Sequence, residues 1–389
     1  MKCSLLVVCL LVSSCMTAPR APSNTNPLDC VYVEDGYGAQ GETALEIKPV
    51  VTGLEVPWSL VFLSSEDWLV AERPGRIRRV RGGKLDQAVV AQIPVTTHAE
   101  DGLLGMALHP DFKKNQYLYV YFTYEQNKEL FNRVERYKLS ADYSKAVSDK
   151  IILDRIPAGE KHSGGRIKFG PDGYLYIGTG DAKEPDLAQD QNSLAGKILK
   201  VDSEGRAPEH NPWPGNPAYV VGVRNIQAFD WIDPRTIWVV DHGPSNPVWK
   251  SGGDEVSIAH AGDNLGWPNT WGCEVKTGVI TPQLVWKKAS PPAGAVIYRG
   301  NKIPGWDGSL LVSTLRSEHM HRVVLHSSNS HRISQHEVYL SGAAGFGRLR
   351  EITQAPDGEL YVTTSNCDGR GDCGAEKDKI LRITARVKK

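Results

Sequence analysis

The sequence predicts an all-β protein: a six-bladed β-propeller of four-stranded antiparallel blades. Three observations support this fold class. They are a recurring turn-and-strand motif, the alternation of apolar and polar residues in each copy, and the frequent chain reversal indicated by 38 Gly and 24 Pro residues. The 389 residues also leave room for two smaller sandwich domains, which remain the alternative.

The repeated motif is a Pro-Asp or Asp-Gly turn that leads into a short apolar strand. Apolar side chains recur at every second position, which is the period of a strand and not of a helix. Six copies separated by about the length of one four-stranded blade are typical of a propeller. The copies lie at residues 66–70, 109–120, 170–177, 233–239, 305–311 and 355–362.

The two ends of the propeller are expected to meet. A strand within residues 45–51 would pair with a strand near Lys379–Ile383, because ring closure removes the free sheet edges that invite aggregation. We therefore expect the propeller to span residues 41–389. Connections between blades gather around the central channel, so residues that are distant in sequence can meet there.

The N-terminus indicates export. Residues 1–15 have a cationic start and then an apolar run too short to cross a bilayer, as in a signal peptide. Val12–Cys15 resembles a bacterial lipoprotein cleavage box, which would leave a lipidated Cys15 as the only membrane attachment; ordinary cleavage near Ala18 is the alternative. Residues 16–40 are expected to form a flexible tether and N-terminal segment. The mature protein would be periplasmic, lipid-anchored or secreted.

The charge balance limits the classes of binding partner, and the cysteine content indicates the cellular compartment. Lys plus Arg and Asp plus Glu both total 45, so no net charge attracts nucleic acid or an acidic membrane. Four cysteines remain after the signal and Cys15, an even number in an oxidising compartment. Cys367 and Cys373 bound a short Gly-rich loop that can close on itself, which leaves Cys30 with Cys273. Free or zinc-binding thiols are the alternative, although no Cys-x-x-Cys pair favours metal.

A histidine and an aspartate are candidates for acid–base chemistry. His162 directly precedes a predicted strand at residues 167–169, and Asp181 follows the next strand. The two strands would form a hairpin around the turn at residues 171–173, which brings its ends together. Asp181 could then hold His162 in the tautomer needed to remove a proton. A solvated loop histidine with an unrelated aspartate is the alternative.

Several arginines are candidates for an anion site. Arg348 and Arg350 are two residues apart, so on a strand both guanidinium groups point to the same side. Arg224, Asn225 and Arg316 occupy comparable positions beside strands of other blades. If these residues meet, they form a site for a small polyanion, because the guanidinium fork binds carboxylates in bidentate geometry. Separately, each would be an ordinary surface arginine.

The turn at Gly243 and Pro244 indicates a calcium site. Ca²⁺ takes hard oxygen ligands, including backbone carbonyls, and a Gly-Pro turn can direct its carbonyls toward one ion. Asp254 and Glu255 lie further along the chain and could hold a second, structural ion. Merely solvated acidic side chains are the alternative for this pair.

Together these residues resemble the soluble pyrroloquinoline quinone (PQQ)-dependent glucose and aldose sugar dehydrogenases. The similarity runs over most of residues 50–385 and lies in the order and spacing of its pieces rather than in any one of them. The most specific pieces are residues 101–112, 162–181, 222–227, 241–244, 266–268 and 348–350.

The resemblance implies an enzyme that oxidises the C1 hydroxyl of an aldose to a lactone. The cationic set and Asn225 would bind PQQ, a tricarboxylate ortho-quinone, and Ca²⁺ on the carbonyls of Gly243 and Pro244 would polarise its reacting carbonyl. His162, oriented by Asp181, would take the hydroxyl proton while hydride passes from C1 to the quinone. An external electron acceptor would then reoxidise the cofactor.

Three positions depart from the family pattern or match it loosely. Glu100 stands where a Gln contacts cofactor and sugar, so we expect it to be protonated, paired with an arginine or turned away. Arg316 stands where a Lys contacts the cofactor, and Arg keeps the charge but not the point geometry. Trp286 aligns with an aromatic that covers the cofactor, with packing inside a blade as the alternative. A cofactor-free binding propeller and a calcium-dependent lactonase are the competing functions.

Overall fold

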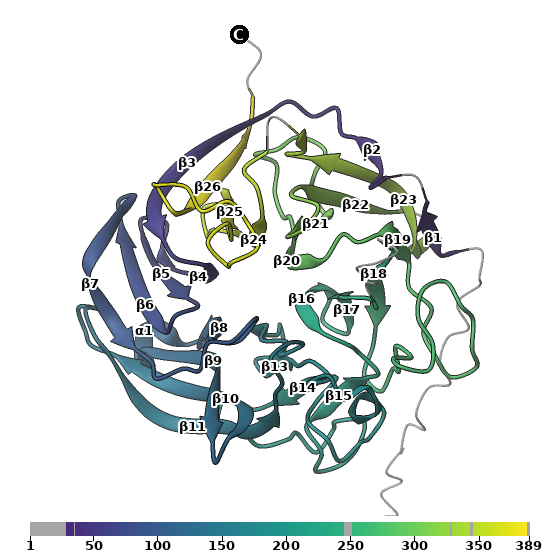
Figure 1. Cartoon of the computed structure of the whole chain (residues 1–389), viewed down its shortest axis with the longest axis horizontal. Helices are drawn as coiled ribbons and strands as arrows, with labels where there is room; N and C mark the ends of the chain where they lie inside the picture. Colours follow the sequence, from purple (N-terminus) through teal and green to yellow (C-terminus); the bar gives the residue numbers. More distant parts are fainter. Residues whose placement is uncertain (1–28, 35, 245–250, 327–328, 343–344, 387–389) are drawn as a thin grey trace, which may run out of the picture.

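The computed structural model describes residues 29–34, 36–244, 251–326, 329–342 and 345–386, and it confirms the six-bladed β-propeller (Figure 1). Four strands form each antiparallel blade, with the first strand nearest the central axis. The predicted export signal, Cys15 and the predicted flexible tether, residues 16–28, lie outside the described residues.

The first three blades follow one another along the chain. Their strands are β4 (Pro57–Ser64), β5 (Asp67–Glu72), β6 (Arg76–Arg81) and β7 (Lys84–Gln92); β8 (Leu103–Leu108), β9 (Tyr117–Gln126), β10 (Glu129–Leu139) and β11 (Ala146–Pro157); and β12 (Ile167–Phe169), β13 (Leu175–Gly178), β14 (Lys197–Val201) and β15 (Ala218–Val221).

The last three blades complete the ring. Their strands are β16 (Ile226–Asp233), β17 (Thr236–Asp241), β18 (Ser251–Ala259) and β19 (Leu284–Lys288); β20 (Pro292–Ile297), β21 (Leu310–Thr314), β22 (Met320–His326) and β23 (Asn329–Tyr339); and β24 (Leu349–Gln354), β25 (Leu360–Thr364), β26 (Asp378–Ala385) and β3 (Leu45–Leu54). Helical segments are short and include α1 (Phe112–Asn115) and η2 (Pro185–Ala188). In the described part of the chain, no helix has the length and apolar character needed to cross a membrane.

The ring closes as the sequence predicts. Strand β26 pairs antiparallel with β3, with Arg382 opposite Lys48 and Ile383 opposite Ile47. The last blade therefore contains three strands from the C-terminal end of the chain and one from the N-terminal end. This pairing joins the ends of the ring and leaves no open gap between the first and last blades.

The N-terminal segment that follows the predicted tether is ordered against the propeller. Strands β1 (Val31–Val33) and β2 (Ala39–Gln40) add parallel fifth strands to the fourth and fifth blades, beside β19 and β23. A disulfide from Cys30 to Cys273 fixes this segment, and a second disulfide joins Cys367 to Cys373. Both predicted disulfides are thus present. The flexible tether itself is predicted for residues 16–28, which lie outside the described residues.

Apolar side chains fill the spaces between neighbouring blades. In one cluster, Tyr119 and Tyr121 of β9 pack with Ile177 and Leu199 of the third blade. Full burial of one such large side chain stabilises a fold by about 1.5–3 kcal/mol relative to leaving it exposed. Because every blade is packed on both sides, the frame that carries the loops is rigid.

Arg166 ties five blades together at the central axis. It lies directly before β12, and its guanidinium donates to the carbonyls of Gln227 at 2.9 Å and Ala293 at 3.1 Å. It also forms a buried ion pair with Glu351 and lies 4.4 Å from the ring centroid of Trp58. Arg166 and Glu351 are therefore each paired although buried, and the starts of the inner strands are held in a fixed arrangement.

Candidate active site

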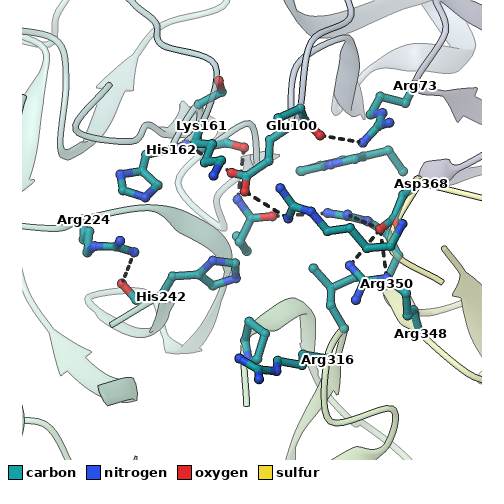
Figure 2. Close-up of a pocket in the computed structure, with 18 of the residues that line it drawn as sticks. Arg73, Glu100, Lys161, His162, Arg224, His242, Arg316, Arg348, Arg350 and Asp368 are labelled. Atoms are coloured by element: carbon teal, nitrogen blue, oxygen red, sulfur yellow. Dashed lines mark hydrogen bonds and ion pairs between the residues drawn. The ribbon is translucent and has the colours of Figure 1, made fainter. Parts of the chain in front are cut away.

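Loops at one end of the propeller enclose a cavity of about 690 Å³ (Figure 2). In an antiparallel blade, the entry into the first strand and the connection between the second and third strands lie at the same end. These two kinds of loop build the cavity wall, and all six blades contribute. The charged lining residues are Arg73, Glu100, Lys161, Lys183, Arg224, Arg316, Arg348, Arg350, Asp368 and Arg370.

The structure brings His162 and Asp181 into contact at the cavity wall. His162 Nδ1 lies 2.8 Å from Asp181 Oδ1, and the His162 side chain is 15% exposed while that of Asp181 is fully buried. A carboxylate only accepts hydrogen bonds, so Nδ1 is the donor, and in the neutral imidazole Nε2 then keeps its lone pair. This is the tautomer that a general base requires.

Two glycines allow the loops of His162 and Asp181 to touch. A Cβ atom at Gly180 would lie 1.7 Å from the His162 carbonyl oxygen, and one at Gly164 would lie 2.5 Å from the carbonyl carbon of Thr179. His162 itself has a φ of +63°, a left-handed conformation that non-glycine residues adopt only where the surroundings enforce it. The position of the base is therefore set by the backbone on both sides.

Asp181 has hydrogen-bond donors on each oxygen. Oδ1 also accepts the backbone N–H of Lys183 at 2.8 Å, and Oδ2 accepts the indole N–H of Trp267 at 2.9 Å. Burial would raise its pKa, but the hydrogen bond from His162 and these two further donors outweigh burial and hold the pKa of Asp181 below its ordinary value. The carboxylate is ionised and fixed, so it orients the imidazole.

Glu100 is paired with an arginine, which is one of the three states expected for it. Its Oε1 accepts from Arg370 at 3.2 Å, and its Oε2 accepts the backbone N–H of His162 at 3.1 Å. Burial opposes ionisation, yet the His162 N–H and the nearby cations lower the pKa of Glu100 below its ordinary value. The carboxylate thus links the loop of the base to the loop of Arg370.

Arg348 and Arg350 form one wall of the cavity together with Asp368 (Figure 2). Asp368 Oδ2 accepts from Arg348 Nε at 3.0 Å and Nη2 at 2.8 Å, and it lies 3.8 Å from Arg350 Nη2. Ser365 and Gln227 contact the Arg350 guanidinium at 3.3 and 3.4 Å. Both arginine side chains are less than one-tenth exposed, so their positions are set by packing and hydrogen bonds.

The cavity carries a large local excess of positive charge. Among the described residues, eight Lys or Arg side chains line it against two carboxylates, in a chain whose opposite charges balance overall. Burial lowers the pKa of Arg350 to about 9; Asp368 opposes this change, whereas Arg73 and Arg348 add to it. A buried cation whose charged form is disfavoured is stabilised when an anion binds beside it. The wall therefore suits a small polyanion.

Asp241 fixes the backbone of Arg224 and Asn225. Its Oδ2 accepts the Arg224 N–H at 2.8 Å, and its Oδ1 accepts the Asn225 N–H at 2.7 Å. The Arg224 guanidinium lines the cavity and lies 5.4 Å from the ring centroid of Trp267. The Asn225 side chain is buried, and its Oδ1 accepts the Gly164 N–H at 3.0 Å. Arg224 faces the cavity, whereas Asn225 braces its wall.

Gly243 and Pro244 directly follow the cavity residue His242. The Gly243 N–H donates to Asp254 Oδ1 at 3.2 Å, and Asp254 Oδ2 accepts the Ser290 N–H at 2.7 Å. Burial raises the pKa of Asp254 to about 7. Backbone carbonyls are hard oxygen ligands of the kind that Ca²⁺ takes, and a cation beside this turn would favour the ionised form of the buried Asp254. The chemistry of these groups therefore suits a Ca²⁺ ion.

The structure does not bring Asp254 and Glu255 together as ligands of a second ion. They are successive residues of β18, so their side chains point to opposite faces of the sheet. Asp254 braces the Gly243 turn, while Glu255 accepts the Gly272 N–H at 3.3 Å. Among the described residues, no group of three or more His, Cys, Asp or Glu side chains is arranged to hold a metal.

Trp286 packs inside a blade and does not line the cavity, which corrects the expectation that it covers a cofactor. Its side chain in β19 is fully buried and stacks on His321, with ring centroids 4.4 Å apart. Its indole N–H donates to His336 at 3.3 Å. Among the described residues, the tryptophan that lines the cavity is Trp58, at the start of β4.

Sequence reasoning missed several residues of the cavity wall. Arg73, which was not predicted, follows β5 directly, and the predicted Arg316 stands soon after the equivalent strand β21. A position soon after the second strand of a blade was therefore a signal that could have identified Arg73. Asp368 and Arg370 lie inside the loop closed by the second disulfide. The spacing of its cysteines predicts a closed loop but says nothing about the direction in which its side chains point.

Comparison with known proteins gives matches that span most of the propeller. The profile of the Glucose / Sorbosone dehydrogenase family matches residues 54–381. An aldose sugar dehydrogenase of Streptomyces coelicolor, solved in its PQQ-bound form, is 32% identical with a TM-score of 0.78, covering 89% of this chain and 99% of that one.

Two curated relatives have similar names. An aldose sugar dehydrogenase of Escherichia coli is 29% identical over 359 residues, covering 84% of this chain and 94% of the relative. A quinoprotein glucose dehydrogenase of Acinetobacter calcoaceticus is 25% identical over 413 residues, covering 82% of this chain and 84% of the relative. These alignments span most of the propeller that carries the cavity.

Proposed function

This chain belongs to the Glucose / Sorbosone dehydrogenase family, and from that premise we propose that it is a PQQ- and calcium-dependent aldose dehydrogenase. It oxidises the C1 hydroxyl of a sugar to a lactone. One observation carries the proposal: a base held in its proton-accepting tautomer and a wall of buried arginines line the same cavity. The PQQ-bound relative and the quinoprotein relative support the choice of cofactor.

The residues of the cavity suit the cofactor by charge and by position. Arg224, Arg316, Arg348 and Arg350 would hold the carboxylates of PQQ, and the buried guanidinium of Arg350 would gain a counterion. The carbonyls of Gly243 and Pro244 would hold Ca²⁺. Bound PQQ would supply an ortho-quinone that takes the C1 hydrogen with its electron pair, and Ca²⁺ would act as a Lewis acid.

His162 removes the proton in this reaction. Its Nε2 accepts the proton of the C1 hydroxyl, so that the C1–O bond becomes a carbonyl as the C1–H bond breaks. Asp181 keeps the Nδ1 proton in place and stabilises the imidazolium that forms. A general base of this kind contributes about 10²–10⁴-fold to a rate.

We also propose that the protein works outside the cytoplasm and passes its electrons to an external acceptor. Residues 1–15 have the pattern of an export signal, and the two disulfides are typical of an oxidising compartment. A lipid on Cys15 would hold the propeller at a membrane surface. The net charge of zero gives no general attraction to a nucleic acid.

Reconstitution tests the function directly. Purified protein, freed of metal with a chelator, is given PQQ, Ca²⁺ or both, and dye reduction is followed with a panel of aldoses. We expect activity only with both additions, and a rise in melting temperature on adding both, since a ligand of the native state stabilises it. No dye reduction with any aldose, together with no PQQ-induced absorbance change, would contradict the proposal. Hydrolysis of lactones without PQQ would favour the lactonase alternative.

A further inference from the structure

The cofactor does not account for all the positive charge of the cavity. In the part of the chain that the structure describes, eight cationic side chains face two carboxylates, and a tricarboxylate cofactor would neutralise only half of that excess. Asp368 and Glu100 are already engaged by Arg348 and Arg370. Some cations of the wall therefore have no anionic partner even when the proposed cofactor is bound.

Two of these cations stand beside the base. Lys161 directly precedes His162, and Lys183 lies two residues after Asp181, with its N–H bonded to that carboxylate. The two loops touch, because the Ala182 N–H donates to the His162 carbonyl at 3.3 Å. Both lysines line the cavity next to the group that must meet the substrate.

The two lysines differ from the arginines in their surroundings. Their side chains are exposed, and within the described residues neither ammonium forms an ion pair. Arg348, by contrast, donates two hydrogen bonds to one buried carboxylate. An exposed, unpaired ammonium is free to reorient toward an incoming anion, whereas the arginine wall is fixed in advance.

We propose that the sugar oxidised here is anionic: an aldose that carries a carboxylate or a phosphate group, bound with that group at Lys161 and Lys183. The proposal rests on the proposed function, because it names the substrate class of the same site. The C1 hydroxyl meets His162, and the charged substituent at the other end of the sugar ring meets the lysines. The exposed lysines also attract such a substrate from solution, an effect that salt screens.

The test compares matched sugars on the protein loaded with PQQ and Ca²⁺. The value of kcat/KM is measured for glucose, glucuronate and glucose 6-phosphate, and for the three galactose counterparts. We expect at least one anionic sugar to exceed its neutral counterpart by about tenfold or more at low ionic strength, with the advantage shrinking at about 1 M salt, where the Debye length is about 3 Å. The uronate and phosphate arms distinguish the two sources of charge.

Variants of the two lysines test whether they cause the preference for an anionic sugar. Lys161→Gln combined with Lys183→Gln should lower the ratio of kcat/KM for the anionic sugar over the neutral one by about tenfold, the scale of one or two charge-assisted contacts. Lys183→Glu should lower it further. Lys128→Gln, an exposed lysine in the turn between β9 and β10, is the matched control and should leave the ratio unchanged. Melting curves show whether each variant is folded.

The possible outcomes distinguish failure of the proposed substrate class from failure of the proposed dehydrogenase function. A neutral sugar preferred over both anionic forms, or a preference that survives Lys161→Gln with Lys183→Gln, overturns the inference about the substrate while dye reduction still supports the dehydrogenase. Failure to bind PQQ, seen by absorbance without any sugar, overturns the proposed function itself.

Discussion

Two walls of the same cavity are built in different ways. The arginine wall, formed by Arg348, Arg350 and Asp368, is buried, with Asp368 hydrogen-bonded to Arg348 and ion-paired with Arg350. The base wall, formed by Lys161, His162 and Lys183, has one side chain fixed by a buried carboxylate and two that extend into solvent. Figure 2 shows His162 and the arginine pair on separate sides of the cavity, with Glu100 between them.

The difference between the two walls indicates which kind of ligand each of them is suited to bind. A wall whose cations are ordered before binding loses little side-chain freedom when an anion arrives, and that suits a cofactor that stays bound. A wall with mobile charges around one rigid base can admit a substrate and release a product. The three predictions that follow test this division, beginning with the largest expected effect.

Replacing the base should stop turnover without emptying the cofactor site. His162→Gln keeps a polar side chain but cannot accept a proton, so we expect kcat to fall by about 10² or more. PQQ affinity, measured by calorimetry or absorbance, should change little, because the arginines lie on the other wall. A fully active His162→Gln variant would refute the assignment of the base.

Removing a cation from the arginine wall should weaken cofactor binding and leave the catalytic base in place. Arg350→Ala should weaken PQQ binding by about 10- to 100-fold, since a hydrogen bond to a charged group contributes about 1.5–3 kcal/mol. At saturating PQQ, turnover should recover much of its value. Arg235→Ala, in the exposed turn between β16 and β17, serves as the control. If both variants bind PQQ equally well, the cofactor does not lie on this wall.

The sequence predicts the propeller fold better than it predicts the side-chain contacts in the cavity walls. The six turn-and-strand copies, the closure of β26 on β3 and both disulfides depend on local pattern or on chain topology, and these are read directly from residue order. The contact of His162 with Asp181 follows from one hairpin, because the register of β12 and β13 fixes which ends meet.

What the sequence could not provide was the direction of individual side chains. Trp286 is a large aromatic in a family-like position, yet the stacking of blades buries it beside His321. Asp254 and Glu255 are adjacent acids, but strand geometry separates their carboxylates. Glu100 had three possible states, and contacts with His162 and Arg370, both distant in the chain, decide between them. Each outcome depends on contacts between residues far apart in the chain.

The smallest predicted effect concerns how the arginine wall is held in order. Asp368 and Arg370 lie in the loop that the Cys367–Cys373 disulfide closes, so this bond limits the motion of the carboxylate that positions Arg348. Replacing both cysteines with Ala should leave the fold intact. PQQ binding should weaken by about two- to tenfold, because ordering one or two side chains then costs about 0.5–1.5 kcal/mol each on binding.

The other disulfide provides the control for this prediction. The Cys30–Cys273 bond fixes the N-terminal segment on the fourth blade, away from the cavity lining. Replacing that pair with Ala should lower the melting temperature and leave PQQ affinity unchanged. If instead both double variants bind PQQ as tightly as the parent protein, the arginine wall is ordered by packing alone, and its contrast with the base wall does not depend on the closed loop.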